Sequence, residues 1–275
     1  MFRLHRLREV FGLGPRLPDI TGNRPALPAP PQPAQPVCVI GDIHGMSGLL
    51  DAMLAKVADQ PQADTARIIF TGDLIDRGPQ SAAVLRRVAG LCQSGSGRHI
   101  CLMGNHERML LDFLTDPARW GKRWISAGGA ETLISYSITA RINAATEAAR
   151  FVALADALRA AMPDGTVNWL TGLPLYWQEG NLGVVHAGAD PALALADQPA
   201  ATLLWGHPKF LKTPRQDSLW VAHGHNIVPH VQVANGRIAV DTGAYRTQRL
   251  SAMWFDSQGA RVLHVGNSNL DIELP

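Results

Sequence analysis

The chain has 275 residues, of which 46% are apolar and 17% are charged, and its formal net charge is +2. This composition is typical of a globular protein with one large domain or two small ones, and the near-neutral charge argues against a nucleic-acid partner. The sequence lacks an apolar run of about 18 residues that would predict a membrane span, and its three cysteines do not form the pattern of a disulfide framework.

The first 36 residues differ from the rest. They contain five arginines against two acidic residues, so this segment carries +3, and six prolines stand between residues 25 and 36. We expect residues 1–36 to be a basic, proline-rich and poorly ordered tail, whose proline-rich part is not expected to join a packed element. Within it, residues 1–14 alternate apolar side chains with arginines, and this pattern would suit a short amphipathic helix in weak contact with a membrane surface or a partner.

From Val37 onward, apolar strand-like runs alternate with segments of helical periodicity. This alternation predicts an α/β region with parallel strands. The predicted strands are 37–41, 67–72 and 98–103, and the predicted helices are about 47–59, 80–92 and 106–114.

Residues 116–177 follow a different pattern, with alanine-rich helical stretches over about 129–162. They predict a helical insertion beside the α/β layer. Tryptophans in such a segment more often pack between layers than stack on a ligand. The tryptophans of this region are Trp120, Trp124, Trp169 and Trp177.

The last third returns to short strands, with a strong hairpin signal at Asn235-Gly236. We therefore expect a second, more antiparallel sheet packed on the first, with helices outside, in one domain over residues 37–275. The predicted strands are 182–186, 218–223, 231–233, 237–241 and 261–265.

Three glycine-led loops carry the polar residues of the first half. Each follows a predicted apolar strand, and the carboxyl ends of such strands point into one crevice in an open α/β sheet. Asp42 and His44 are two residues apart, so in an extended backbone their side chains point the same way and offer two ligands to a metal ion. The loops are Gly41-Asp42-Ile43-His44-Gly45, Gly72-Asp73-Leu74-Ile75-Asp76-Arg77-Gly78 and Gly104-Asn105-His106-Glu107.

Together with two later histidine-bearing segments, these loops resemble the phosphoprotein phosphatase family of calcineurin-like metallophosphoesterases. The signature of that family is GDxHG, GDxxDRG and GNHE, and all three match completely. The resemblance runs from about Val37 to Tyr245. It points to the bacterial branch, which includes serine/threonine protein phosphatases and diadenosine tetraphosphatases. It implies an α/β (α+β) fold: a four-layer α-β-β-α sandwich of two mixed sheets.

The same resemblance implies a centre with two divalent metal ions, one of whose ligands, Asp73, would bridge both. Mixed carboxylate, imidazole and amide ligands suit manganese, iron or zinc better than calcium, and manganese is favoured. A hydroxide that bridges the ions would attack phosphorus directly, because metal binding lowers the pKa of water. The implied metal ligands are Asp42, His44, Asp73, Asn105, His186 and His225.

Next to this centre, the resemblance makes His106 the general acid that protonates the leaving oxygen. Asp76 would orient the imidazole of His106 and raise its basicity. Arg77 would hold the phosphate oxygens through its guanidinium fork.

Two histidines, His223 and His225, compete for the last ligand position. The family pattern places the ligand after glycine in a Gly-His pair, which selects His225. His223 is then expected either to contact substrate or simply to pack.

The sequence departs from the family where a second phosphate-binding arginine is expected in a Trp-x-Arg context, because His207 stands there. A histidine is shorter and only partly charged near neutral pH, so the grip on phosphate would be weaker or would come from Lys209, Arg108 or Arg246. Tyr245 is expected to contact substrate or to pack.

Three functions remain open at this stage. The first is a phosphomonoesterase acting on phosphoserine and phosphothreonine in proteins, which the sequence favours because the insertion has few cations. The second is a dinucleoside polyphosphate hydrolase on the same scaffold, acting for example on diadenosine tetraphosphate. The third is a metal-binding regulator with weak activity. A cytoplasmic location is expected.

Overall fold

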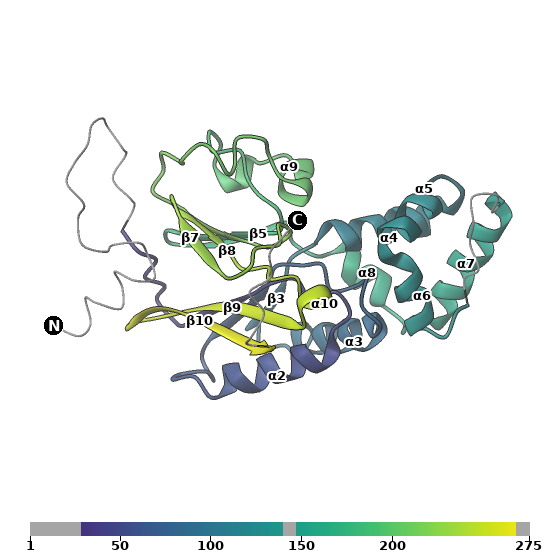
Figure 1. The fold of residues 1–275 in the computed structure, drawn as a ribbon, viewed down its shortest axis with the longest axis horizontal. Helices are drawn as coiled ribbons and strands as arrows, with labels where there is room; N and C mark the ends of the chain where they lie inside the picture. Colours follow the sequence, from purple (N-terminus) through teal and green to yellow (C-terminus); the bar gives the residue numbers. More distant parts are fainter. Residues whose placement is uncertain (1–28, 140–146, 268–275) are drawn as a thin grey trace.

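The computed structural model describes residues 29–139 and 147–267. It contains two five-stranded sheets packed face to face, with helices on their outer faces (Figure 1). The predicted amphipathic segment at residues 1–14 lies outside the described residues. The first sheet has the order β10 (Gly259–Gly266), β9 (Arg249–Asp256), β1 (Val37–Ile40), β2 (Arg67–Phe70) and β3 (His99–Cys101). The second has the order β4 (Tyr176–Glu179), β5 (Leu182–Val185), β6 (Trp220–His223), β8 (Arg237–Ala239) and β7 (Gln232–Ala234).

The first three predicted strands form the parallel part of the first sheet. β1 pairs with β2 and β2 with β3, both in parallel. The sequence did not predict β9, which pairs antiparallel with β1 and is buried along almost its whole length. A fully buried strand shows no alternation between polar and apolar residues, so periodicity alone does not mark it.

The second sheet is mixed, and the expectation of a more antiparallel sheet is wrong. β4 pairs antiparallel with β5, and β7 with β8, whereas β5–β6 and β6–β8 are parallel pairs. The reason is the long connection from β5 to β6, which crosses over the sheet through the helix α9 (Ala200–Trp205) and brings the chain back in the same direction. The predicted Asn235-Gly236 hairpin does join β7 to β8, and both turn residues have positive φ, 51° and 75°.

The four layers follow from the alternation of side chains along the strands. In β1, Val37 and Val39 belong to the apolar cluster between the sheets, whereas Cys38 and Ile40 belong to the cluster under the helices. The helices α2 (Ser47–Ala58) and α3 (Ser81–Cys92) cover the outer face of the first sheet, and α9 covers the outer face of the second (Figure 1). The predicted α-β-β-α sandwich is confirmed.

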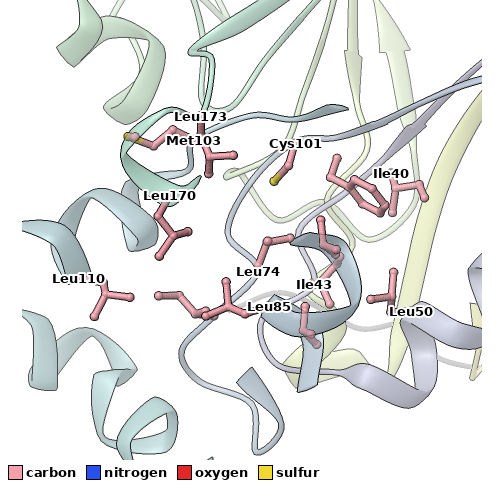
Figure 2. Close-up of a cluster of buried hydrophobic side chains, with 14 of the residues drawn as sticks. Ile40, Ile43, Leu50, Leu74, Leu85, Cys101, Met103, Leu110, Leu170 and Leu173 are labelled. Atoms are coloured by element: carbon pink, nitrogen blue, oxygen red, sulfur yellow. The ribbon is translucent and has the colours of Figure 1, made fainter. Parts of the chain in front are cut away.

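A group of helices lies at one side of the sandwich, between β3 and β4 in sequence (Figure 1). In Figure 2 the buried side chains run from Ile40 and Leu50 on one side to Leu110 and Leu170 on the other, so these helices share one apolar core with the first sheet. The segments are α4 (Asn105–Thr115), α5 (Pro117–Trp124), the π-helical turn η1 (Ile125–Gly129), α6 (Ala130–Ser135), α7 (Ala148–Ala161) and α8 (Thr166–Thr171).

Residues 29–36 contact the second sheet, contrary to the expectation that the proline-rich part would remain unpacked. The carbonyl oxygen of Ala29 accepts hydrogen bonds from the side chains of Asn181 and Trp220, both at 2.9 Å. The amide of Ala34 donates to Glu179. Proline lacks an N–H group, but its neighbours still offer carbonyl oxygens, and these suffice for side-chain donors.

Candidate metal centre

The first and second glycine-led loops are joined by backbone hydrogen bonds. The amides of Ile43 and His44 donate to the carbonyl oxygen of Asp73 at 3.1 and 2.9 Å. Gly78 packs so closely on the carbonyl of His44 that a Cβ atom at this position would overlap it. The glycine is therefore required by close approach of two backbones.

The third loop is joined to the second by Glu107. The carboxylate of Glu107 accepts from the amides of Asp73 and Leu74, both at 2.8 Å, and from Gly104 at 3.0 Å. Burial raises the pKa of this carboxyl to about 7, although the three N–H donors oppose the shift. No role was predicted for Glu107 from the sequence. Glu107 stands three residues after Gly104, which caps helix α4, and this spacing is typical of a side chain that accepts backbone N–H groups at a helix start.

The converging loops form two groups of candidate ligands. His44, Asp73 and His106 make one, and Asp73, His186 and His225 make the other, with the ligand atoms of each group within 4.8 Å of one another. Asp73 belongs to both groups, which is the position that the family resemblance gives to the bridging carboxylate.

The imidazoles of His44 and His186 have a defined orientation. Nδ1 of His44 donates to the carbonyl of Ile75 at 2.7 Å, and Nδ1 of His186 donates to that of Thr71 at 3.0 Å. The Nε2 atom of each ring lies 3.5 Å from an oxygen of Asp73. Burial lowers the pKa of both rings well below the usual value, so each Nε2 carries a lone pair that faces a carboxylate.

Two histidine rings converge at the side chain of Asn105. Its oxygen lies 2.8 Å from Nε2 of His186 and 2.9 Å from Nδ1 of His225. Because Nδ1 of His186 donates to Thr71, its Nε2 is an acceptor that faces another acceptor, and a cation between the two would stabilise both. The donor set therefore fits divalent metal ions of the kind that accept imidazole and carboxylate ligands.

Asp42 lies beside these groups but outside both. Its carboxylate accepts from the hydroxyl of Thr71 at 2.8 Å and from the amide of His225 at 2.9 Å. Burial, and after it the charge of Asp241, raises the pKa of Asp42 well above its usual value. Thr71 and Asp241 were missed, although Asp241 directly follows a strand-like apolar run and Asp42 follows one after a single glycine.

His106 and Asp76 form a tight pair, with 2.7 Å between Nδ1 and Oδ2. The same oxygen accepts from the indole N–H of Trp124 at 3.0 Å, and Oδ1 accepts from the hydroxyl of Thr132 at 2.6 Å. The helices beside the sandwich thus supply two partners of Asp76. The sequence analysis did not identify either, because they lie 48 and 56 residues away along the chain.

Burial disfavours charge on both members of this pair. It raises the pKa of Asp76 to about 8 and lowers the pKa of His106 to about 3. At neutral pH the pair holds two protons and is neutral as a whole. One proton lies between Oδ2 and Nδ1, so the other is carried by Nε2.

Arg77 and Tyr245 lie together at the edge of the centre. Nη1 of Arg77 is 3.3 Å from Nε2 of His44 and 3.4 Å from the hydroxyl of Tyr245. The ring of Tyr245 meets that of His44 edge to face, at 5.2 Å between centroids.

The other two predicted substrate contacts are placed differently. His223 is 1% exposed, and its ring packs against Phe210 with 5.0 Å between centroids. Nε2 of His207 lies 3.7 Å from the carboxylate of Asp190, and a neighbouring carboxylate repels phosphate. Arg108, one of the alternatives considered for the missing arginine, is paired with Asp112. The described geometry brings Arg77 and Tyr245 to the centre, and it gives His223 and His207 other contacts.

Several residues of the centre hold strained backbone conformations. His44, Asp73, Asp76, Arg77 and His225 all have positive φ, between 45° and 70°. Residues other than glycine rarely adopt this region, and such strain persists where the surrounding structure fixes it, often at functional sites.

The geometry agrees with a family comparison. Residues 35–242 match the family model described as calcineurin-like phosphoesterase. The chain belongs to this family. It is therefore a metallophosphoesterase, an enzyme whose family binds divalent metals in a binuclear centre.

Named relatives and one solved structure extend the comparison. The chain is 26% identical over 239 residues to the asymmetrical bis(5'-nucleosyl)-tetraphosphatase PrpE of Bacillus velezensis, covering 79% of this chain and 88% of that protein. It is 30% identical to a symmetrical bis(5'-nucleosyl)-tetraphosphatase of Methylococcus capsulatus over 156 residues, 57% of this chain but only 44% of that protein. The crystal structure of a putative diadenosine tetraphosphatase has the same fold, with a TM-score of 0.59, 20% identity, and coverage of 86% of this chain and 95% of that one.

Within residues 29–139 and 147–267, the structure has no helix whose length and hydropathy would let it span a membrane.

Proposed function

We propose that the enzyme hydrolyses dinucleoside polyphosphates, such as diadenosine tetraphosphate, at a phosphoanhydride bond. The observation that carries this proposal is the likeness to PrpE, which extends over 79% of the chain and most of the relative. The sequence alone favoured phosphoserine and phosphothreonine in proteins, because the insertion offers few cations. That preference gives way to the relatives, since the fold alone does not specify a substrate.

The six predicted ligands would hold two divalent ions, preferably manganese, at the centre described above. Bound there, such ions would neutralise phosphate charge and lower the pKa of water to provide the nucleophile. Asp73 contributes to both groups of ligands. Nδ1 of His44 and Nδ1 of His186 each donate a hydrogen bond to a buried backbone carbonyl. These bonds keep the Nε2 atoms of both rings unprotonated and fixed in direction.

His106 is the proposed general acid. Hydrolysis forms a bond between the water oxygen and phosphorus and breaks the bond between phosphorus and the leaving oxygen, which then needs a proton. Nε2 of His106 donates that proton while Asp76 holds Nδ1. Burial favours the protonated form of the pair, because it raises the pKa of Asp76.

Arg77 is the proposed phosphate clamp. Its guanidinium lies at the edge of the centre and contacts both His44 and Tyr245. A guanidinium can bind two phosphate oxygens at once. A dinucleoside polyphosphate has several phosphates in a row, so binding by Arg77 alone would need support from contacts farther along the substrate.

A comparison of three substrates tests the proposal. The manganese-loaded enzyme is assayed with diadenosine tetraphosphate, a phosphothreonine peptide and an aryl phosphate. We expect kcat/KM for the dinucleotide to exceed that for the peptide by about tenfold or more, which corresponds to about 1.4 kcal/mol of transition-state binding. Turnover of the peptide with no turnover of the dinucleotide would return the assignment to a protein phosphatase.

A metal-binding regulator is the remaining alternative. A regulator has no need for a general acid whose carboxylate partner is itself held by further hydrogen bonds. The intact arrangement of His106, Asp76 and Trp124 therefore argues against this alternative.

A further inference from the structure

A cavity of about 90 Å³ opens between the helices α4 and α5 and the end of α9. In Figure 1, α9 lies over the second sheet, and α4 and α5 lie to its right. The proposed mechanism uses none of this space. The cavity is lined by Met109, Asp112, Trp120, Arg123, Trp124 and Trp205.

Three indole rings and one cation dominate its walls. The guanidinium carbon of Arg123 lies 5.8 Å from the ring centre of Trp120 and 5.1 Å from that of Trp205. The guanidinium carbon of Arg119 also lies 4.7 Å from the ring centre of Trp120. Trp205 is 41% exposed, so part of its ring is open to solvent although Arg123 lies over it. The open part of an indole ring held by a guanidinium is suited to stack a flat aromatic ring.

A carboxylate at the same cavity adds a hydrogen-bond acceptor. Asp112 is held in place by Arg108, whose Nε donates to its Oδ1 at 3.1 Å. Purine bases with an exocyclic amine present N–H donors at their edge. The combination of aromatic faces, Arg123 and Asp112 therefore matches a nucleobase better than a peptide side chain carrying a phosphate.

The cavity begins next to the reacting groups. Trp124 lines it and also donates to Asp76 of the catalytic pair. Asp112 stands six residues after His106 on α4, which places it about 9 Å farther along the helix axis. On the other side, the amide of Ala187, next to the ligand His186, donates to Leu203 of α9, two residues before Trp205.

We propose that the mouth of this cavity is a nucleobase-binding subsite, in which the exposed part of Trp205 stacks one base of the substrate while its phosphates reach the metal centre. The identification of the base as part of a dinucleotide rests on the proposed function. The subsite also supplies the support that Arg77 needs to hold a long substrate.

The test uses inhibition of aryl phosphate hydrolysis by the manganese-loaded enzyme. Adenosine monophosphate is compared with ribose 5-phosphate, which has the same phosphate and sugar but no base. We expect adenosine monophosphate to inhibit about tenfold more strongly, the gain typical of one stacked base. In the variant Trp205→Ala the two inhibitors should become equal within about twofold, while Trp205→Tyr keeps most of the preference because it retains an aromatic face.

The matched control is Leu211→Ala, which removes another exposed apolar side chain, 57% accessible, that does not line the cavity. It should leave both inhibition constants unchanged. Equal inhibition by both compounds in the unmodified enzyme, or an unchanged preference in Trp205→Ala, would overturn the subsite.

This assay separates the two proposals, because it does not depend on turnover of a dinucleotide. If diadenosine tetraphosphate is hydrolysed but the Trp205 variants keep the base preference, the proposed function stands and the subsite is wrong. If the dinucleotide is not hydrolysed but the base preference depends on Trp205, the subsite stands and the proposed function is wrong.

Discussion

The residue that the sequence identified with the clearest chemical role is His106, and the structure explains what it needs in order to act. Its Nδ1 is bound to Asp76 at 2.7 Å, which leaves Nε2 for a substrate. Substituting His106→Asn removes the transferable proton but keeps a polar side chain of similar size. We expect kcat to fall by about 10²–10⁴-fold, measured on an aryl phosphate.

Manganese content and the unfolding midpoint should stay close to those of the unmodified enzyme. Retention of full activity in His106→Asn would show that another group protonates the leaving oxygen. Varying the leaving group of the substrate offers a second check. A leaving group that needs no proton should reduce the fall in kcat that His106→Asn causes.

The residues that support Asp76 allow a finer prediction. Trp124→Phe removes the N–H that donates to Asp76 but retains the ring that stacks on Phe113 at 4.6 Å. On an aryl phosphate, which has no base to enter the cavity that Trp124 lines, we expect kcat to fall by about tenfold with KM unchanged, as when an outer partner of an active-site group is lost. Because that N–H stabilises the carboxylate, its loss should raise the pKa of Asp76 further above 8.

The alkaline loss of activity should therefore move to higher pH in Trp124→Phe, measured as the pH dependence of kcat. A purely structural role would lower stability and leave this profile in place. Thr132→Val is the matched variant, since Thr132 donates to the other oxygen of Asp76, and it should shift the profile in the same direction.

For single residues, the sequence predicts the side chains that would meet a metal ion or the substrate better than the side chains that hold them in place. His44, Asp73 and His106 sit in motifs whose spacing is fixed by short loops, so their convergence could be predicted. Trp124 and Thr132 reach Asp76 only because α5 packs against α4 and α6 packs against α3. No local sequence pattern carries that information.

Among the elements, the loops at the strand ends depend on glycines that allow close packing. A Cβ atom on Gly224 would overlap the carboxylate of Asp42 and crowd the hydroxyl of Thr71. Gly224→Ala should therefore displace Asp42 and lower manganese affinity by about 10–100-fold, the range seen when groups around metal ligands are disturbed. Metal titration by calorimetry would measure the loss.

Gly90→Ala serves as its control. Gly90 lies in α3, and nothing stands within 4 Å of the position of its missing Cβ. Alanine there should stabilise the fold by about 0.5–1 kcal/mol through its helix propensity, without any effect on the metal. Unchanged affinity in Gly224→Ala would show that the Asp42 loop can relax or that Asp42 is not a ligand.

The elements also show where sequence patterns succeed and fail. The Asn235-Gly236 turn specified its hairpin because both positions favour positive φ. β9 and α9 were not predicted, and without α9 the crossover from β5 to β6 could not be foreseen. The second sheet was consequently expected to be more antiparallel than it is.

For the whole molecule, the layered architecture was predictable because it follows from alternation, which is a local property. The first sheet and the helices around α8 share one apolar core, and this could not be predicted from the sequence. The shared core joins residues far apart in the chain, such as Leu110 with Ile40 and Leu170 (Figure 2). The same holds for the cavity between α5 and α9, whose walls come from segments about 80 residues apart in the chain. Substrate selection is thus the property that most depends on the complete fold.

The buried charges make one prediction about the molecule as a whole. Burial raises the pKa of Asp42 and Asp73 well above the usual value, and the pKa values of Glu107 and Asp76 to about 7 and about 8. A carboxyl whose pKa is raised by folding binds more protons in the native than in the unfolded state, so stability falls as pH rises toward the raised pKa.

The buried imidazoles act in the opposite direction, but only at lower pH. Burial lowers the pKa of rings such as His44 and His186. Above about pH 7.5, one unit above the ordinary pKa of histidine, they are almost entirely neutral in both states and contribute little to the slope. The interval from about pH 7.5 to about 8 therefore reports mainly on the carboxyl groups.

In that interval the chelator-treated enzyme should lose about 1.4 kcal/mol per pH unit for each proton released on unfolding. The manganese-loaded enzyme should show a flatter profile, because bound cations stabilise the ionised carboxylates in the native state. Urea unfolding at about pH 7.5, 7.75 and 8, with and without manganese, measures both slopes. Asp42→Asn should reduce the slope of the chelator-treated enzyme, because it removes one carboxyl from the buried group. Equal slopes with and without manganese would mean that the ions do not bind at these carboxylates, and the ligand set would then have to be reassigned.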